Sequence, residues 1–144
     1  MLVVVAIIGL IVGVSMPSVT AGLDSVRMAT ATSSVAGFLN RALTHVERRQ
    51  QPIELIISPA EGRIQVFSNE PGFERELKMP DGVVIEGVLP ENEGDPRGAR
   101  HLLLLPGATA PGIGIVLSNR HGTRRIVHLD PMTGFPKVES VEAK

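Results

Sequence analysis

The stretch that decides the fold is MLVVVAIIGLIVGVSMPSVTAGL, residues 1–23, which contains no charged residue and no histidine. Every residue from 1 to 14 is apolar or glycine, and the first charge along the chain is Asp24. An α-helix rises about 1.5 Å per residue, so a bilayer core of about 30 Å needs ~20 residues. The apolar run is slightly short for such a span. We expect it to be held in a bilayer, in a bundle of like helices, or in each by turns.

Two interpretations of this segment compete. A secretory signal begins with a basic region and ends in a small-residue cleavage site. No Lys or Arg precedes the apolar run, and Ala6 lies too early to end it. We therefore favour a membrane helix whose first turn precedes Met1.

Pro17 is predicted to break the helix, because proline lacks an N–H and clashes with the preceding turn. Neighbouring helices or a membrane make such a break tolerable. Beyond it the pattern becomes amphipathic, and the helix is predicted to reach about Arg49 and to stop before Pro52. We expect it to pack on the rest of the chain from about Ser34 onward. Apolar residues recur at helical spacing at Val19, Leu23 and Val26, and again at Val35, Leu39, Ala42 and Val46.

The remainder of the chain is punctuated by Gly, Pro, Asn and Asp, which separate short β-prone runs. Ile113, Ile115 and Leu117 alternate, and should share one face of a strand. Turns are predicted at 119–122 and 130–134, closed by Gly122 and Gly134. The strands are expected at 53–58, 63–68, 73–78, 83–87, 101–105, 113–118, 124–129 and 136–139.

These elements predict an α+β fold, with a long N-terminal helix and an antiparallel β-sheet globular domain. The apolar half of the helix should protrude, and its second half should pack on the globular head. We divide the chain into a membrane or filament-core helix (1–23), its amphipathic continuation (24–52) and a β-rich head (53–144). With no cysteine and only 3% aromatic residues, the core must be aliphatic and free of disulfides.

The N-terminal helix resembles that of type IV pilins and pseudopilins, on the residues Ala6-Ile7-Ile8-Gly9-Leu10 and Pro17. The resemblance implies a pilin-like fold and five further residues before Met1. Those five would include the methylated first residue and a glutamate. A basic leader and the prepilin peptidase site would precede them, so prepilin peptidase would act on a segment outside these 144 residues.

The C-terminal half resembles the minor pseudopilins of the GspH/FimT family. The matching residues are Pro106-Gly107, Gly112-Ile113-Gly114-Ile115, Arg124-Arg125-Ile126-Val127 and Asp130-Pro131-Met132-Thr133-Gly134. Residues 44–47 depart from the small and basic residues that the family usually has there, and residues 91–100 are unmatched.

The resemblance implies a structural minor pseudopilin of a type II secretion or type IV pilus machine. Such a subunit passes once through the bacterial inner membrane, keeps its head in the periplasm, and assembles at or near the tip of a pseudopilus. Its partners would be other pseudopilins or minor pilins and membrane lipid, with no cofactor. The residues expected to pack in membrane or filament are Leu2, Val3, Val4, Val5, Ile7, Ile8, Leu10, Ile11, Val12 and Val14.

An alternative is a FimT-like minor pilin that binds DNA during uptake through Arg120, His121, Arg124 and Arg125. Four basic groups offer few phosphate contacts, and no aromatic residue accompanies them for base stacking. We therefore expect these residues to form a solvated hairpin or a contact with a neighbouring subunit.

No nucleophile elbow, phosphate loop or zinc helix is present, so the sequence predicts no enzyme. His45, His101, His121 and His128 lack a metal-ligand spacing. Residues 91–95 alternate side-chain oxygens like the start of a calcium loop, but Pro96 and Leu102 stand where glycine and glutamate are needed. We expect an acidic surface loop and no metal.

Overall fold

The computed structural model describes residues 1–141, without the side chains of residues 15–18, 20 and 21. Over this part the chain forms one long helix followed by eight strands, which confirms the predicted α+β class. Each strand lies where the sequence predicts it, with bounds that differ by at most two residues. The elements are α1 (Leu2–Arg49), β1 (Ile53–Ser58), β2 (Arg63–Ser68), β3 (Glu74–Lys78), β4 (Val83–Leu89), β5 (Arg100–Leu104), β6 (Gly114–Asn119), β7 (Arg124–Leu129) and β8 (Pro136–Val141).

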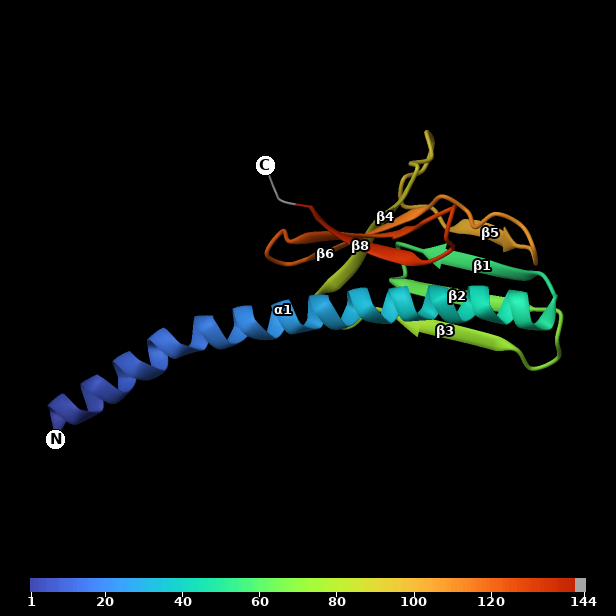
Figure 1. The fold of residues 1–144 in the computed structure, drawn as a ribbon. Coiled ribbons are helices and arrows are strands. Elements are labelled where there is room, and N and C mark those ends of the chain that lie inside the picture. Colours follow the sequence, from blue (N-terminus) through green and yellow to red (C-terminus); the bar gives the residue numbers. More distant parts are fainter. Residues whose placement is uncertain (142–144) are drawn as a thin grey trace.

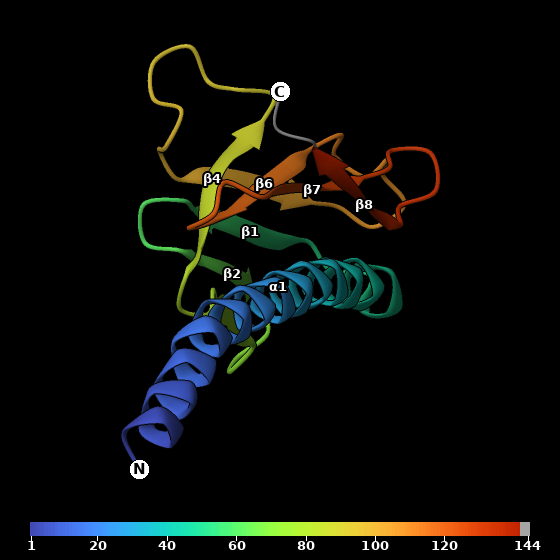
Figure 2. The ribbon, with the colours of Figure 1, turned by 90° about the vertical axis from the view of Figure 1, so that its left-hand side faces the viewer.

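The strands form two antiparallel four-stranded sheets, ordered β3-β2-β1-β5 and β4-β6-β7-β8. Both sheets lie against the C-terminal part of α1, whose N-terminal end extends well beyond them (Figure 1). The loop between β4 and β5 projects away from α1 (Figure 2).

The two predicted turns are confirmed. In the β6–β7 hairpin Gly122 has φ 81°, and its N–H donates to Asn119 O at 3.1 Å. In the β7–β8 turn Gly134 has φ 71° and donates to Asp130 O at 2.8 Å. Positive φ is inexpensive for glycine, so these two positions set the register of the strands on either side.

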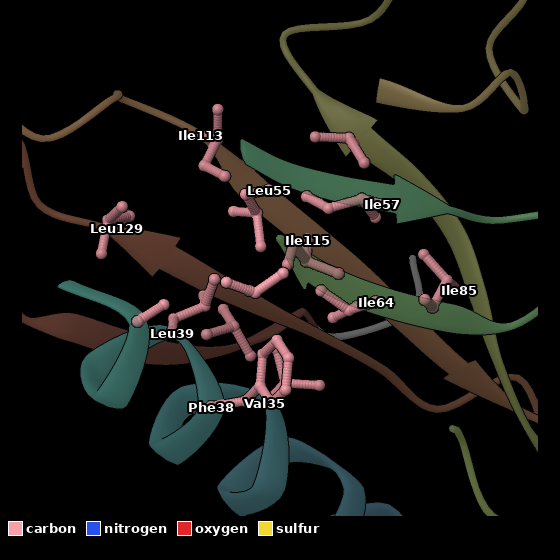
Figure 3. Packing of buried hydrophobic residues seen from close by; sticks show 14 of the residues in the cluster. Val35, Phe38, Leu39, Leu55, Ile57, Ile64, Ile85, Ile113, Ile115 and Leu129 are labelled. Carbon is pink, nitrogen blue, oxygen red and sulfur yellow. The ribbon is translucent and has the colours of Figure 1, made fainter. Parts of the chain in front are cut away.

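The core is aliphatic apart from Phe38 and lies where the two sheets meet α1 (Figure 3). Ile113, Ile115 and Leu117 are all buried, as their alternation predicts. Leu55 and Ile64 approach them from the other sheet, and Val35 and Leu39 from α1. Successive side chains of a strand point to opposite faces, and β1, β2, β4, β6 and β7 each give one buried face to this core.

The packed part of α1 starts earlier than predicted. Burial begins at Met28 rather than at Ser34, and Ala31 and Thr32 are buried as well. These small side chains let the helix backbone approach the sheets. Val19, Leu23 and Val26 repeat at helical spacing, yet they are 67%, 48% and 62% exposed, so their face does not contribute to the head's core.

The predicted end of the helix at Arg49 is confirmed. Gln50 takes the left-handed conformation, with φ 54°, and its N–H donates to Val46 O at 2.9 Å. Arg48 and Arg49 occupy the last turn, where positive charge is favourable to the helix dipole. α1 is a single helix from Leu2 to Arg49, so the helix is not interrupted at Pro17, whose side chain is among those not described.

Candidate functional site

The first candidate site is the N-terminal apolar segment, residues 2–14 of α1. Its large side chains are between 53% exposed at Val12 and 88% exposed at Leu2. Ten such residues follow one another with only Ala6, Gly9 and Gly13 between them: Leu2, Val3, Val4, Val5, Ile7, Ile8, Leu10, Ile11, Val12 and Val14.

These side chains surround the helix, because successive residues of an α-helix are rotated by about 100°. A helix that is apolar on all sides is normally buried in a large core or in a membrane. Full burial of a Val, Leu or Ile side chain stabilises by about 1.5–3 kcal/mol, so ten of them represent roughly 15–30 kcal/mol as an upper bound. Burial of this segment would therefore be strongly favourable, but the head does not bury it.

Among the described residues, no helix is long and apolar enough to cross a bilayer.

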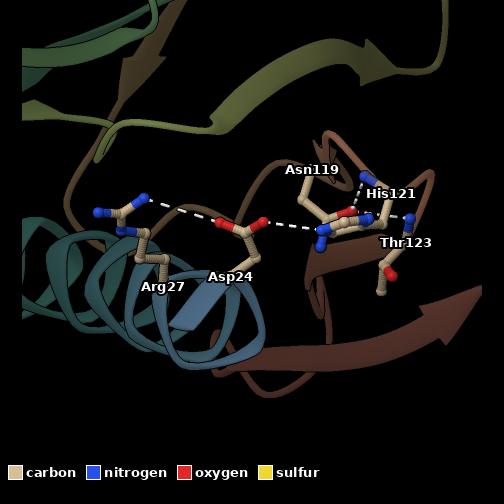
Figure 4. Close-up of polar contacts among 5 residues, drawn as sticks. All are labelled: Asp24, Arg27, Asn119, His121 and Thr123. Carbon is tan, nitrogen blue, oxygen red and sulfur yellow. Dashed lines mark hydrogen bonds and ion pairs between the residues drawn. The ribbon is translucent and has the colours of Figure 1, made fainter. Parts of the chain in front are cut away.

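The second candidate site is the contact between α1 and the β6–β7 hairpin (Figure 4). His121 Nε2 and Asp24 Oδ2 are 2.8 Å apart, although 97 residues separate them in the chain. Arg27 Nη1 lies 3.7 Å from the other carboxylate oxygen of Asp24. Asn119 Oδ1 accepts the backbone N–H groups of His121 and Thr123, both at 3.0 Å, and so fixes the hairpin that presents His121.

The other basic residues of this hairpin point in different directions. Arg124 pairs with Glu86 of β4. Arg125, the next residue of β7, instead lines a cavity of about 220 Å³ together with His121 and Met28. The side chain of Arg120 lies beside Gly82 of the β3–β4 turn, on the side of the hairpin where Asp24 lies.

The four predicted DNA-contact residues therefore do not form one positive face. Arg124 and Arg125 are neighbours in a strand and project to opposite sides. Arg124 and His121 each face a carboxylate, that of Glu86 or of Asp24. This arrangement favours the structural interpretation of the hairpin, in which His121 fastens it to α1.

The histidines are dispersed. His101 Nδ1 lies 2.8 Å from Glu54, and His128 Nε2 lies 3.4 Å from Glu139. His45 stacks on Phe73, with ring centroids 3.9 Å apart. Within the described residues no group of three or more His, Asp or Glu is placed to hold a metal ion.

Sequence reasoning missed the partners of the hairpin. Asp24 is recognisable only as the first charge after the apolar run, which gives no sign of its contact with residue 121. Glu86 lies where the pairing of β4 with β6 shifts register between Ile85 and Gly87. A bulge of this kind redirects a side chain in a way that an alternating pattern does not reveal.

Comparisons of the chain with models of protein families, with curated proteins and with solved structures found no match.

Proposed function

We propose that the protein is a structural subunit of a pseudopilus, a minor pseudopilin of the GspH/FimT type in a type II secretion or type IV pilus machine. The N-terminal apolar segment would hold it in the inner membrane before assembly and pack against the helices of other pseudopilins afterwards. The pilin-like head would stay in the periplasm. The observation that supports this proposal best is the continuous exposure of the large side chains of residues 2–14.

The physical basis of the proposal is that lipid tails and neighbouring apolar helices satisfy such a segment about equally well. Transfer from bilayer to filament would therefore cost little hydrophobic free energy. The head would remain unchanged, because its core is complete without residues 2–14.

A vesicle flotation assay tests the membrane step. The purified full chain should float with vesicles of phosphatidylethanolamine and phosphatidylglycerol. Leu10→Asp should lower partitioning on the order of a hundredfold, because a carboxylate within an apolar helix costs about 2.5–3.5 kcal/mol on insertion.

Leu103→Asp is the matched control. It removes a leucine of similar exposure, 64% against 70% for Leu10, from β5 of the head. Flotation of this variant should equal that of the unchanged protein. If the unchanged chain stays in the aqueous fraction, or if both substitutions lower flotation equally, the membrane role of the segment is wrong.

DNA binding is the less favoured function, because Arg124 lies on the opposite side from Arg125, and Arg124 and His121 each face a carboxylate. A mobility-shift titration with duplex DNA over a salt series separates the two functions. The structural proposal expects no shift even at low salt, where phosphate contacts are strongest.

A further inference from the structure

A cavity of about 320 Å³ lies between the C-terminal part of α1 and β3, the edge strand of its sheet. Phe38 of α1, Val66 of β2 and Phe73 give it apolar walls. Ligand-binding pockets typically measure about 300–1,000 Å³ and combine apolar walls with a few polar groups. The cavity falls at the small end of that range and lies outside both candidate sites described above.

Phe73 is held in place by two contacts. His45 of α1 stacks on its ring with an interplanar angle of 15°. The guanidinium carbon of Arg75 lies 5.1 Å from the centroid of the same ring, at a distance suited to a cation–π contact. Both contacting residues also line the cavity, so its aromatic wall and its polar groups are built as one unit.

Two arginines line the cavity without a carboxylate partner in the described structure, so the unpaired charge at the cavity is positive. Arg41 takes part in no ion pair among the described residues. Within the described part of the chain, the one hydrogen bond that Arg75 donates goes to the backbone oxygen of Glu74, at 2.9 Å. Glu76 also lines the cavity, but it accepts from Gln65 Nε2 at 3.0 Å and has Arg63 and Lys78 beside it.

His45 adds a polar atom without a hydrogen bond. Its Nε2 is buried and has no hydrogen-bond partner among the described residues. Glu70 Oε2 lies 3.7 Å away, within ion-pair distance but too far for a hydrogen bond. A buried nitrogen of this kind loses its hydration without compensation unless something else contacts it.

We propose that this cavity binds a small apolar molecule that ends in a carboxylate. The apolar part would lie against Phe38 and Phe73, and the carboxylate would face Arg41 and Arg75. A guanidinium binds a carboxylate with two parallel hydrogen bonds, which a neutral group of the same shape cannot reproduce. A peptide strand fits less well, because the charged residues of β3 disfavour strand addition at this edge. The proposal does not depend on the function proposed above.

Calorimetric titration of the full chain, in the same nonionic detergent throughout, tests the proposal with three probes of similar shape. They are phenylpropionate, phenylpropionamide and phenylpropylamine. The carboxylate should bind with a Kd of about 1 mM or below, and the amide and the amine at least about tenfold more weakly. Changes in amide chemical shift should be centred on residues 38–45 and on β3.

Arg41→Gln and Arg75→Gln should each weaken phenylpropionate binding about tenfold, because each removes a charged donor. Arg48→Gln is the control, since Arg48 lies on the same helix but lines a different cavity. Thermal unfolding of each variant should match that of the unchanged chain, which shows that the head is intact.

Three results would overturn the proposal: no binding of the carboxylate, equal binding of the three probes, or binding that neither arginine substitution weakens. Chemical shifts centred on another part of the head would do the same.

Discussion

Two parts of one helix differ in how their apolar side chains are satisfied. In residues 2–14 these side chains surround the helix and remain exposed. In residues 28–46 the core side chains follow a single face and are at most 7% exposed; they are Met28, Ala31, Val35, Phe38, Leu39, Ala42 and Val46. The lesson is that apolar content alone does not determine burial within a subunit. A narrow apolar face can be covered by the subunit's own sheets, whereas a helix that is apolar on all sides needs other molecules around it.

The largest effect is expected when a leucine is replaced by alanine in each of the two parts. Leu39→Ala should lower the free energy of unfolding by about 2–5 kcal/mol, because Leu39 is 1% exposed and its truncation leaves a cavity. Leu10→Ala should change that free energy by less than about 0.5 kcal/mol. Urea unfolding followed by circular dichroism, in one detergent, measures both. Equal losses would show that residues 2–14 contribute to the stability of the head.

A smaller loss of stability is expected from a substitution at Asp24, which lies between the two parts. Asp24→Asn should destabilise by about 0.5–1 kcal/mol, because it weakens a partly exposed contact with His121. Amide hydrogen exchange should become faster around residues 22–27. A double-mutant cycle with His121→Gln isolates the pair. Arg27→Gln is the control, since its 3.7 Å contact should contribute less. Additive losses from Asp24→Asn and His121→Gln would mean that the two groups are not coupled.

The next prediction concerns the hydroxyl of Thr32, a buried residue of the packed part of α1. Its hydroxyl donates to Met28 O at 2.7 Å, one helical turn earlier, and the residue is 3% exposed. Thr32→Val keeps the shape, and Met28 O can still accept the helical N–H, so the free energy of unfolding should change by less than about 0.5 kcal/mol. A loss above about 2 kcal/mol in urea unfolding would instead indicate that the hydroxyl has a larger role.

The smallest expected effect is a change in the stability of the protein at acid pH. Lys137 donates to Asp130 at 2.7 Å, and this hydrogen bond, helped by the backbone N–H of Met132, lowers the pKa of Asp130 from 3.8 to about 2. Because the pKa is lower in the folded state, the contribution of Asp130 to stability is present above pH 3.8 and is lost as the pH falls toward 2.

The measurement is the urea midpoint of the unchanged chain and of Asp130→Asn across this pH range. The difference between the two midpoints should be largest above pH 3.8 and should disappear near pH 2. Residues 2–14 contain no titratable side chain, so acid should act only on the rest of the chain. A constant difference at all pH values would contradict the assignment to this carboxylate.

The sequence was sufficient to predict the elements of the fold because their signals are local. Gly122 and Gly134 mark turns, and the alternation of Ile113, Ile115 and Leu117 identifies the inward face of β6. The start of the packed part was misplaced because Met28 is followed by Ala31 and Thr32, which carry too little apolar surface to continue a recognisable buried face. Their burial follows from the position of the sheets, which no local pattern specifies.

Little of the candidate sites could be predicted beyond residues 2–14, because the remaining contacts join distant parts of the chain. Arg124 and Arg125 suggest a basic cluster when read in sequence, but strand geometry separates their side chains. The cavity beside β3 combines Arg41 and His45 with Phe73 and Arg75, which meet only after α1 lies across the sheet. Pairing of that kind depends on the tertiary fold.

The length over which α1 is packed has a mechanical consequence. From Met28 to Val46 the helix lies along the head for about 27 Å, given a rise of about 1.5 Å per residue. A pull along the helix axis from its N-terminal end would load these contacts in shear and all together, whereas a sideways pull would peel them one after another. The head is therefore attached in the geometry that best resists axial tension.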